Sequence, residues 1–523
     1  MAAALLSACG GGSSGEGGTA QSAQEKPAAS EVTPSCTGCA ALSATQYAGQ
    51  GVGIWEKTNT SAGAQDVPVY ITGLKGQPVT LVFSNESGDA GAAANNAGSK
   101  ASGPAMAPSG AAPSPHEVAQ EFNRTGWKNL STQLRGKPGS VVRMAAPTPN
   151  VPPVPGDARA WRHPDGSVHQ LSMVGQRAAG DGMVFNVWVE NGYGGAGKVD
   201  AAIVETILQG VARSGGIYEM VMALGGPLWG PHDAAGSYLP ASRNWIDIVL
   251  LDFGPNESAY QGYFWGLNNY LGNWAASSNE SLAVVLNAPN VATLDTRVTL
   301  SNVAHELTHL QNFYRRNVVA DGSLGSFDTW LEEMTAMMAE DFFSMHLSPV
   351  FNSIREGRLP TYLAGNYNCP MLEFTGFDTH CESYSVAGTF GGYLLRQHGT
   401  ALFKDLLTRR QHADSLTLMD EALRASVPSS SFNQAFRRFA VTAGALLPPD
   451  APGGYGFPAW HDAQFPLIQI NPADWAWGRS VPPQLPAQIA SFGSVPLVRA
   501  SSGSFYSEVV RVPPGATLSV VIR

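Results

Sequence analysis

The sequence predicts an α+β protein in which a large mixed central region lies between two smaller β-rich regions. Short segments that alternate apolar and polar residues, typical of strands, occur between residues 51 and 83 and again at 516–522. Between 183 and 445, apolar runs typical of buried strands are mixed with amphipathic helical patterns. At 523 residues the chain is too long for one hydrophobic core, so we expect two to four structural units.

Changes in composition divide the chain into five regions. Gly-, Ser-, Ala- and Pro-rich stretches form no core and predict a tether and a linker, while the other regions carry strand and helix patterns. The expected regions are an N-terminal tether (1–45), a small β domain (46–85), a low-complexity and Pro-rich linker with one helix at 116–134 (86–157), a main α+β domain (158–447) and a C-terminal β-rich region (448–523).

Within the main domain, apolar runs predict strands and periodic patterns predict helices. We expect strands at 183–189, 245–251 and 281–286, and helices at 201–212, 303–314, 328–341, 384–395, 401–412 and 432–445. The strand at 281–286 is the last before the helix at 303–314. Thr299 or Ser301 could cap that helix.

The helix at 303–314 carries the pattern His-Glu-x-x-His. His305 and His309 are four residues apart, so both imidazoles lie on one helical face and can bind the same metal ion. Glu306 is offset around the helix and would reach a water on the metal instead. This arrangement suits hydrolysis, because zinc lowers the pKa of its water and a carboxylate can take the proton. We therefore expect a zinc site.

Zinc in a catalytic site needs a third protein ligand and an open fourth position. A third His six residues after the second is excluded, because position 312 is Asn and position 315 is Arg. A Glu on the following helix is the other known solution. Glu332 and Glu333 on the helix at 328–341 both remain candidates from the spacing alone.

Residues 330–336, Trp-Leu-Glu-Glu-Met-Thr-Ala, resemble the second motif of the hyicolysin-type neutral zinc metallopeptidases, a family of the Glu-zincin (gluzincin) group. That motif typically reads Trp-Leu-Asn-Glu-Gly-x-Ala, and the alignment places the ligand on Glu333. Glu332 and Met334 depart from the Asn and Gly of the family pattern. The resemblance implies a zincin-like metallopeptidase domain over 158–447, a protein or peptide substrate, and an edge strand at 281–286 that pairs with an extended substrate.

Peptide hydrolysis also needs a donor for the oxyanion. Tyr384 begins a block, Tyr-x-x-Ala-x-x-Phe-x-x-Tyr-Leu, that is similar to one in the family, so we prefer it to His380. A metal-bound imidazole usually donates its second N–H to a carboxylate or carbonyl, and Glu340, Asp341 or Asp328 could accept it. The remaining histidines form no ligand spacing and are expected to be ordinary surface or core residues: His116, His163, His169, His232, His346, His398, His412 and His461.

We therefore expect a zinc metalloendopeptidase with Glu306 as general base. A zinc aminopeptidase or amidase could use the same ligands, and a surface adhesion or scaffold protein could hold a structural metal. The intact Glu306 argues against the last alternative, because a structural site has no need of a general base.

Charge and cysteines indicate the surroundings of the protein. A net charge of −10 without a basic cluster argues against nucleic acid binding. Leu6-Ser-Ala-Cys9 resembles a bacterial lipobox, although only eight residues precede Cys9, too few for a complete signal peptide. Acylated Cys9 would anchor the protein to a membrane of the bacterial cell envelope, as an outer-membrane lipoprotein facing the periplasm or exterior; otherwise the protein is secreted. The other cysteines predict the disulfides Cys36–Cys39 and Cys369–Cys381.

Overall fold

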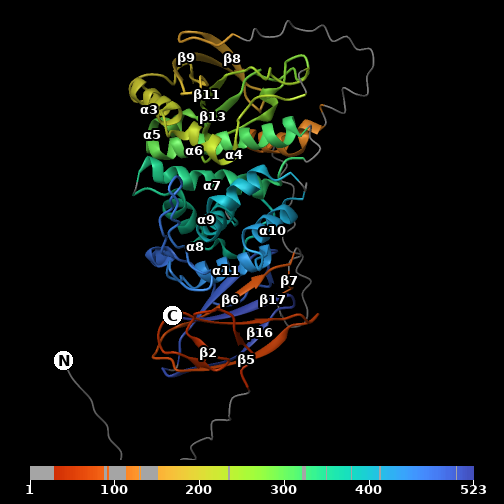
Figure 1. Ribbon diagram of the computed structural model, residues 1–523, viewed down its shortest axis with the longest axis vertical. Coiled ribbons are helices and arrows are strands. Elements are labelled where there is room, and N and C mark those ends of the chain that lie inside the picture. Colours follow the sequence, from red (N-terminus) through yellow and green to blue (C-terminus); the bar gives the residue numbers. More distant parts are fainter. Residues whose placement is uncertain are drawn as a thin grey trace, which may run out of the picture.

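The computed structural model has the expected α+β architecture, arranged in three tiers. A mixed sheet with helices lies at one end, further helices fill the middle, and a β-sandwich lies at the other end (Figure 1). The structure describes residues 29–87, 91–92, 113–128, 130, 151–233, 236–320, 325–348, 350–378, 380–410, 414–501 and 503–523. Cys9, and residues 131–134 of the helix expected at 116–134, lie outside the described residues.

A six-stranded sheet supports the site-bearing helices, in the order β12-β13-β11-β10-β9-β8. Its centre is parallel, because β10 pairs in parallel with β11, and β11 with β13. Helix α3 (Ala201–Ala212) packs directly on β9, because a Cβ added to Gly175 would lie 2.9 Å from the side chains of both Val204 and Leu208. The strands are β8 (Ala158–Arg162), β9 (Val168–Ala178), β10 (Val184–Glu190), β11 (Trp245–Leu251), β12 (Gly262–Tyr263) and β13 (Ala283–Asn287).

The expectation that the strand at 281–286 forms an edge of the sheet was wrong. β13 lies between β11 and the short strand β12, which pairs antiparallel with it and takes the edge position. The register places Gly262 opposite Leu286 and Tyr263 opposite Val285. Two residues are too few to show an alternating pattern, so β12 could not be predicted from the sequence.

The site-bearing helix α6 (Thr296–Phe313) begins earlier than its apolar pattern indicated. Its N-cap is Asp295, whose side chain accepts a hydrogen bond from the backbone N–H of Arg297 at 2.9 Å. The predicted caps, Thr299 and Ser301, are wrong: both lie buried inside the helix. The first turn precedes the apolar stripe, so the stripe alone could not mark where the helix starts.

Two long helices behind α6 pack closely because one of them presents glycines. A Cβ on Gly388 of α9 (Ser383–Thr408) would lie 2.7 Å from Met337 of α7 (Thr329–Leu347). The helix expected at 401–412 continues α9 to Thr408, after a break at Gly399, where φ is +69°. The other α-helices among the described residues are α1 (Pro115–Glu121), α3 (Ala201–Ala212), α4 (Ile217–Gly225), α5 (Ala288–Thr293), α8 (Leu359–Leu363), α10 (Ser415–Ser426) and α11 (Phe432–Gly444).

The two terminal β-rich regions form one sandwich. The last strand, β17, lies between two N-terminal strands, β4 and β6, and pairs antiparallel with both. In the facing sheet the C-terminal strand β16 pairs with β5. The strands are β1 (Thr33–Pro34), β2 (Ala41–Ser43), β3 (Gln46–Tyr47), β4 (Gly53–Thr58), β5 (Gln65–Thr72), β6 (Val79–Asn85), β15 (Ser494–Arg499), β16 (Phe505–Val512) and β17 (Ala516–Ile522), with β7 (Gly91–Ala92) and β14 (Gln488–Ile489) forming a separate pair.

Both expected disulfides, Cys36–Cys39 and Cys369–Cys381, are present, which confirms that pairing.

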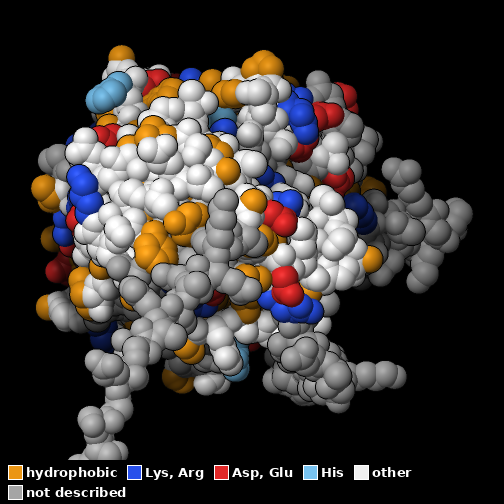
Figure 2. All heavy atoms as spheres, turned by 90° about the horizontal axis from the view of Figure 1, so that it is seen from below, with side chains coloured by type: hydrophobic (Ala, Val, Ile, Leu, Met, Phe, Trp, Pro, Cys, Tyr) orange, Lys and Arg blue, Asp and Glu red, His pale blue; other side chains and the backbone are white. Residues whose placement is uncertain are grey.

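Seen from below, the surface carries acidic and basic side chains interspersed with small groups of hydrophobic ones (Figure 2). Among the described helices, none combines the length and the apolar character needed to cross a bilayer.

Candidate metal centre

Two adjacent helices bring three potential metal ligands together. His305 and His309 come from α6 and Glu333 comes from α7, and one ligand atom from each lies within 4.8 Å of the others. Glu333 Oε2 is 3.1 Å from His305 Nε2 and 3.7 Å from His309 Nε2. All three side chains are buried. Two imidazoles and one carboxylate are a donor set that zinc accepts in catalytic sites, so these residues fit a metal ion.

The second nitrogen of each imidazole bonds a carboxylate of α7. His305 Nδ1 lies 2.7 Å from Glu340 Oε1, and His309 Nδ1 lies 2.8 Å from Glu332 Oε1. These bonds direct each Nε2 toward the centre, as carboxylate partners do around protein-bound metals. Consecutive residues on a helix point about 100° apart. Glu332 therefore orients His309, while Glu333 faces both Nε2 atoms.

The electrostatics of the three groups are strongly coupled. Burial alone would raise the pKa of Glu333, but the charge of His309 and the hydrogen bond from His305 outweigh it and hold this pKa well below its usual range. Burial would lower the pKa of His305, yet its bonds to Glu333 and Glu340 raise it to about 9. The metal-free imidazoles thus hold protons that a metal would displace, which makes metal binding dependent on pH.

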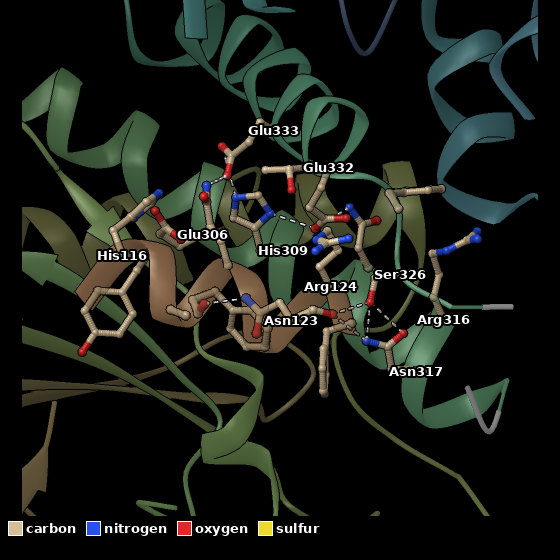
Figure 3. Close-up of a pocket in the computed structure, with 18 residues that line it drawn as sticks. His116, Asn123, Arg124, Glu306, His309, Arg316, Asn317, Ser326, Glu332 and Glu333 are labelled. Atoms are coloured by element: carbon tan, nitrogen blue, oxygen red, sulfur yellow. Dashed lines mark hydrogen bonds and ion pairs between the residues drawn. The ribbon is translucent and has the colours of Figure 1, made fainter. Parts of the chain in front are cut away.

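Glu306 lies beside these ligands without joining them. Figure 3 shows Glu306, His309 and Glu333 around one hollow. Burial raises the pKa of Glu306 to about 7, a value suited to a group that takes and returns a proton near neutrality. Its Oε2 is buried and has no hydrogen-bond partner among the described residues. It is therefore free to accept a proton from a bound molecule.

Tyr384 also reaches the site. It lines a cavity of about 340 Å³ together with His305 and Glu306. Burial raises the pKa of its phenol well above the usual value, so the hydroxyl stays protonated and can donate a hydrogen bond. The Arg358 guanidinium lies 5.5 Å from the Tyr384 ring centre and 3.3 Å from Glu340.

The other candidates lie elsewhere. The side chain of His380 is 93% exposed and lies 3.3 Å from Asp378. Asp341 bonds Arg396, and Asp328 occupies the N-cap position of α7. Of the three carboxylates considered as imidazole partners, the structure therefore brings only Glu340 to a ligand.

Two residues of the site were missed, and both come from the predicted linker. Gln120, on α1 (Pro115–Glu121), donates a hydrogen bond from Nε2 to Glu333 Oε1 at 2.6 Å. His116, one turn earlier, stacks on Tyr260 at 4.3 Å and lies 2.9 Å from the Tyr384 hydroxyl. Their separation from α6 exceeds 170 residues, and no spacing rule connects positions so far apart.

A known protein family matches the part of the chain that contains the three potential metal ligands, Glu306 and Tyr384. The family described as Peptidase M30 matches residues 165–523, which include α6, α7 and α9 but not α1. A second match, to a domain of unknown function (DUF8571), covers residues 34–95, which contain the N-terminal strands of the sandwich. No curated protein matches the chain.

Proposed function

The chain belongs to the peptidase M30 family and is thus a metallopeptidase, and from that premise we propose that it is a zinc-dependent endopeptidase. In this proposal His305, His309 and Glu333 hold the zinc ion and Glu306 is the general base. The convergence of the three ligand atoms within 4.8 Å is the observation that carries the proposal. Zinc is the preferred ion because it combines imidazole with carboxylate ligands in hydrolytic sites.

The protein side chains have separate tasks. When bound, zinc supplies a Lewis acid that polarises the scissile carbonyl and makes water more acidic. Glu306 removes a proton from the attacking water through its unpartnered oxygen and returns the proton to the leaving amine. The protonated Tyr384 hydroxyl donates to the oxyanion as charge develops there.

The shape of the cleft favours cleavage within a chain. Glu306 lines two hollows, one enclosed by α1, α6 and α7 and one between the first half of α6 and Tyr384, so space continues on two sides of the proposed general base. An aminopeptidase would instead close one side and place an acidic group there for the substrate amine. An extended polypeptide that passes through the cleft is the substrate class that this shape supports.

The test compares zinc-loaded wild-type protein with Glu306→Gln, using an unfolded protein and a peptide with blocked ends. We expect wild type to cut both substrates internally and the variant to bind one zinc without cutting either. Cleavage of free N-termini alone would favour the aminopeptidase instead. Full activity in Glu306→Gln would overturn the mechanism.

The place of action remains a prediction from the sequence. Lipid attached to Cys9 would hold the peptidase at the bacterial envelope. In bacteria fed radiolabelled palmitate, wild type should become labelled and Cys9→Ser should not. Equal labelling would contradict the proposed anchor.

A further inference from the structure

We propose that residues 113–128 are an internal inhibitor, a segment of the chain that occupies the substrate-binding cleft. The proposal rests on the endopeptidase function argued above. In this proposal the segment competes with substrate for the cleft. The intact chain is therefore latent, and it gains activity when the segment leaves the cleft.

The segment crosses the cleft directly over the general base and the metal ligands. Ser114 caps α1 by accepting from the Glu117 N–H, and Pro115 takes the first helical position. A π-helical turn, η1 (Phe122–Gly126), continues the helix. Figure 3 shows this helix running past the labelled side chains of Glu306, His309 and Glu333.

The first part of the segment binds two groups that the proposed reaction uses. The Gln120 amide donates to Glu333, a carboxylate assigned to the metal. His116 lies at hydrogen-bond distance from the Tyr384 hydroxyl, which would otherwise face an oxyanion. A substrate chain cannot reach either group while α1 is in place.

The middle of the segment binds the edge of the six-stranded sheet. Asn123 Nδ2 donates to the Phe264 carbonyl, and Asn123 Oδ1 accepts from the Gly266 N–H, both at 2.7 Å. These backbone groups follow the edge strand β12, and Trp265 between them is extended. The Asn123 amide thus makes the donor–acceptor pair that the N–H and C=O of one residue in an added strand would make.

Apolar contacts hold the other side of the segment. Ala119 and Trp127 are buried, and the Phe122 ring packs edge-on against Trp265 and Tyr270. With the segment in place, the hollow that it encloses with α6 and α7 is only about 40 Å³, whereas the neighbouring cavity beside Tyr384 is about 340 Å³. The segment therefore fills much of one half of the cleft.

Two features indicate that the segment is separable from the enzyme it covers. The family match begins at residue 165 and includes all the proposed catalytic and metal-binding residues, so α1 lies outside it. A seven-residue helix is also too short to be stable by itself, and the cleft must supply its stability. Weakening the contacts with the cleft should therefore release the segment.

The experiment uses the full zinc-loaded chain and a blocked fluorogenic peptide. Asn123→Ala removes the two bonds to the sheet edge without touching a proposed metal ligand, and we expect kcat/KM to rise about tenfold. Glu121→Ala is the matched control, because Glu121 is exposed and bonds Arg124 and Thr125 of its own segment. This variant should cut at the wild-type rate. A synthetic peptide of residues 113–128 should inhibit Asn123→Ala.

A third form, in which a Gly/Ser sequence of equal length replaces residues 113–128, separates the two proposals. If it cuts faster than wild type, the inhibitor stands even where Asn123→Ala fails to fold. If wild type cuts as fast as this form, the inhibitor is overturned and the peptidase function remains. If no form cuts while each binds one zinc, the endopeptidase function itself is overturned.

Discussion

The helix α7 carries two buried carboxylate clusters that differ in how their charge is balanced. On one face Asp341 lies 3.1 Å from Arg396, and both side chains are fully buried. Asn352 also donates to Asp341 at 2.6 Å, and Arg396 donates to the Ile468 carbonyl at 2.8 Å. Cation, anion and hydrogen-bonding partners are all supplied by the protein.

The other face of α7 gathers carboxylates in excess. Glu332, Glu333 and Glu340 surround two imidazoles, and Glu306 adds a fourth carboxylate from α6. Arg358 is the one arginine that an ion pair joins to this cluster among the described residues. A closed ion pair stabilises one conformation, whereas acceptors that exceed the available cations prepare a place for a metal ion. We therefore expect the Asp341 cluster to stabilise the fold and the Glu-rich cluster to bind the metal ion.

Replacing Glu306, the proposed general base, should have the largest effect on activity. Glu306→Gln keeps the shape of the side chain but removes its capacity to take a proton, so kcat should fall by about 10³-fold with zinc still bound. Turnover and zinc content are measured on the same samples. Glu205→Gln is the control, because Glu205 is exposed on α3 and distant in sequence from the site. An equal loss in both variants would contradict the assignment.

Breaking the closed ion pair should affect folding instead of metal binding. Arg396→Met leaves Asp341 buried without its cation and should lower the free energy of unfolding by about 3–5 kcal/mol. Denaturant titration measures this loss. The folded fraction of the variant should still bind zinc at a ratio of one. An unchanged free energy of unfolding would contradict the structural role given to the Asp341–Arg396 pair.

Changes to the outer carboxylates should weaken the metal site more gently. Glu340→Gln and Glu332→Gln each replace the carboxylate partner of one imidazole by a neutral amide, and each should reduce zinc affinity about 10- to 100-fold. Competition with a coloured chelator measures the affinity. A loss in only one variant would show that the two histidines depend differently on their partners.

Lowering the pH should have the smallest effect: on the acidic side, kcat/KM should fall about tenfold per pH unit. Burial raises the pKa of Glu306 to about 7, so the ionised form that accepts a proton is lost as pH falls through this value. A bound cation shifts a carboxyl pKa downward. The acid limb of kcat/KM should therefore have a midpoint no higher than about pH 7, and a midpoint above 8 would count against Glu306 as the base.

Much of the candidate site was predictable because its residues lie within two helices. The spacing of His305 and His309 placed both on one face of α6. The preference for Glu333 over Glu332 came instead from the resemblance of residues 330–336 to the family motif, because the spacing left both open. Periodicity also predicted α3 and strands β10, β11 and β13 within two residues, and it predicted the start of α7 but not its end, since the helix expected at 328–341 continues to Leu347. Such inferences need only local geometry, since a helix fixes which side chains share a face.

The tertiary structure alone decided how distant segments meet. It placed β12 at the sheet edge, interleaved β17 with β4 and β6, and laid α1 across the cleft. These contacts depend on burial and hydrogen bonding between parts of the chain more than 20 residues apart, which leave no periodic trace in the sequence. Residue types and their spacing within helices were therefore enough to predict a metal-binding site. Which other segments of the chain lie over that site depends on tertiary packing.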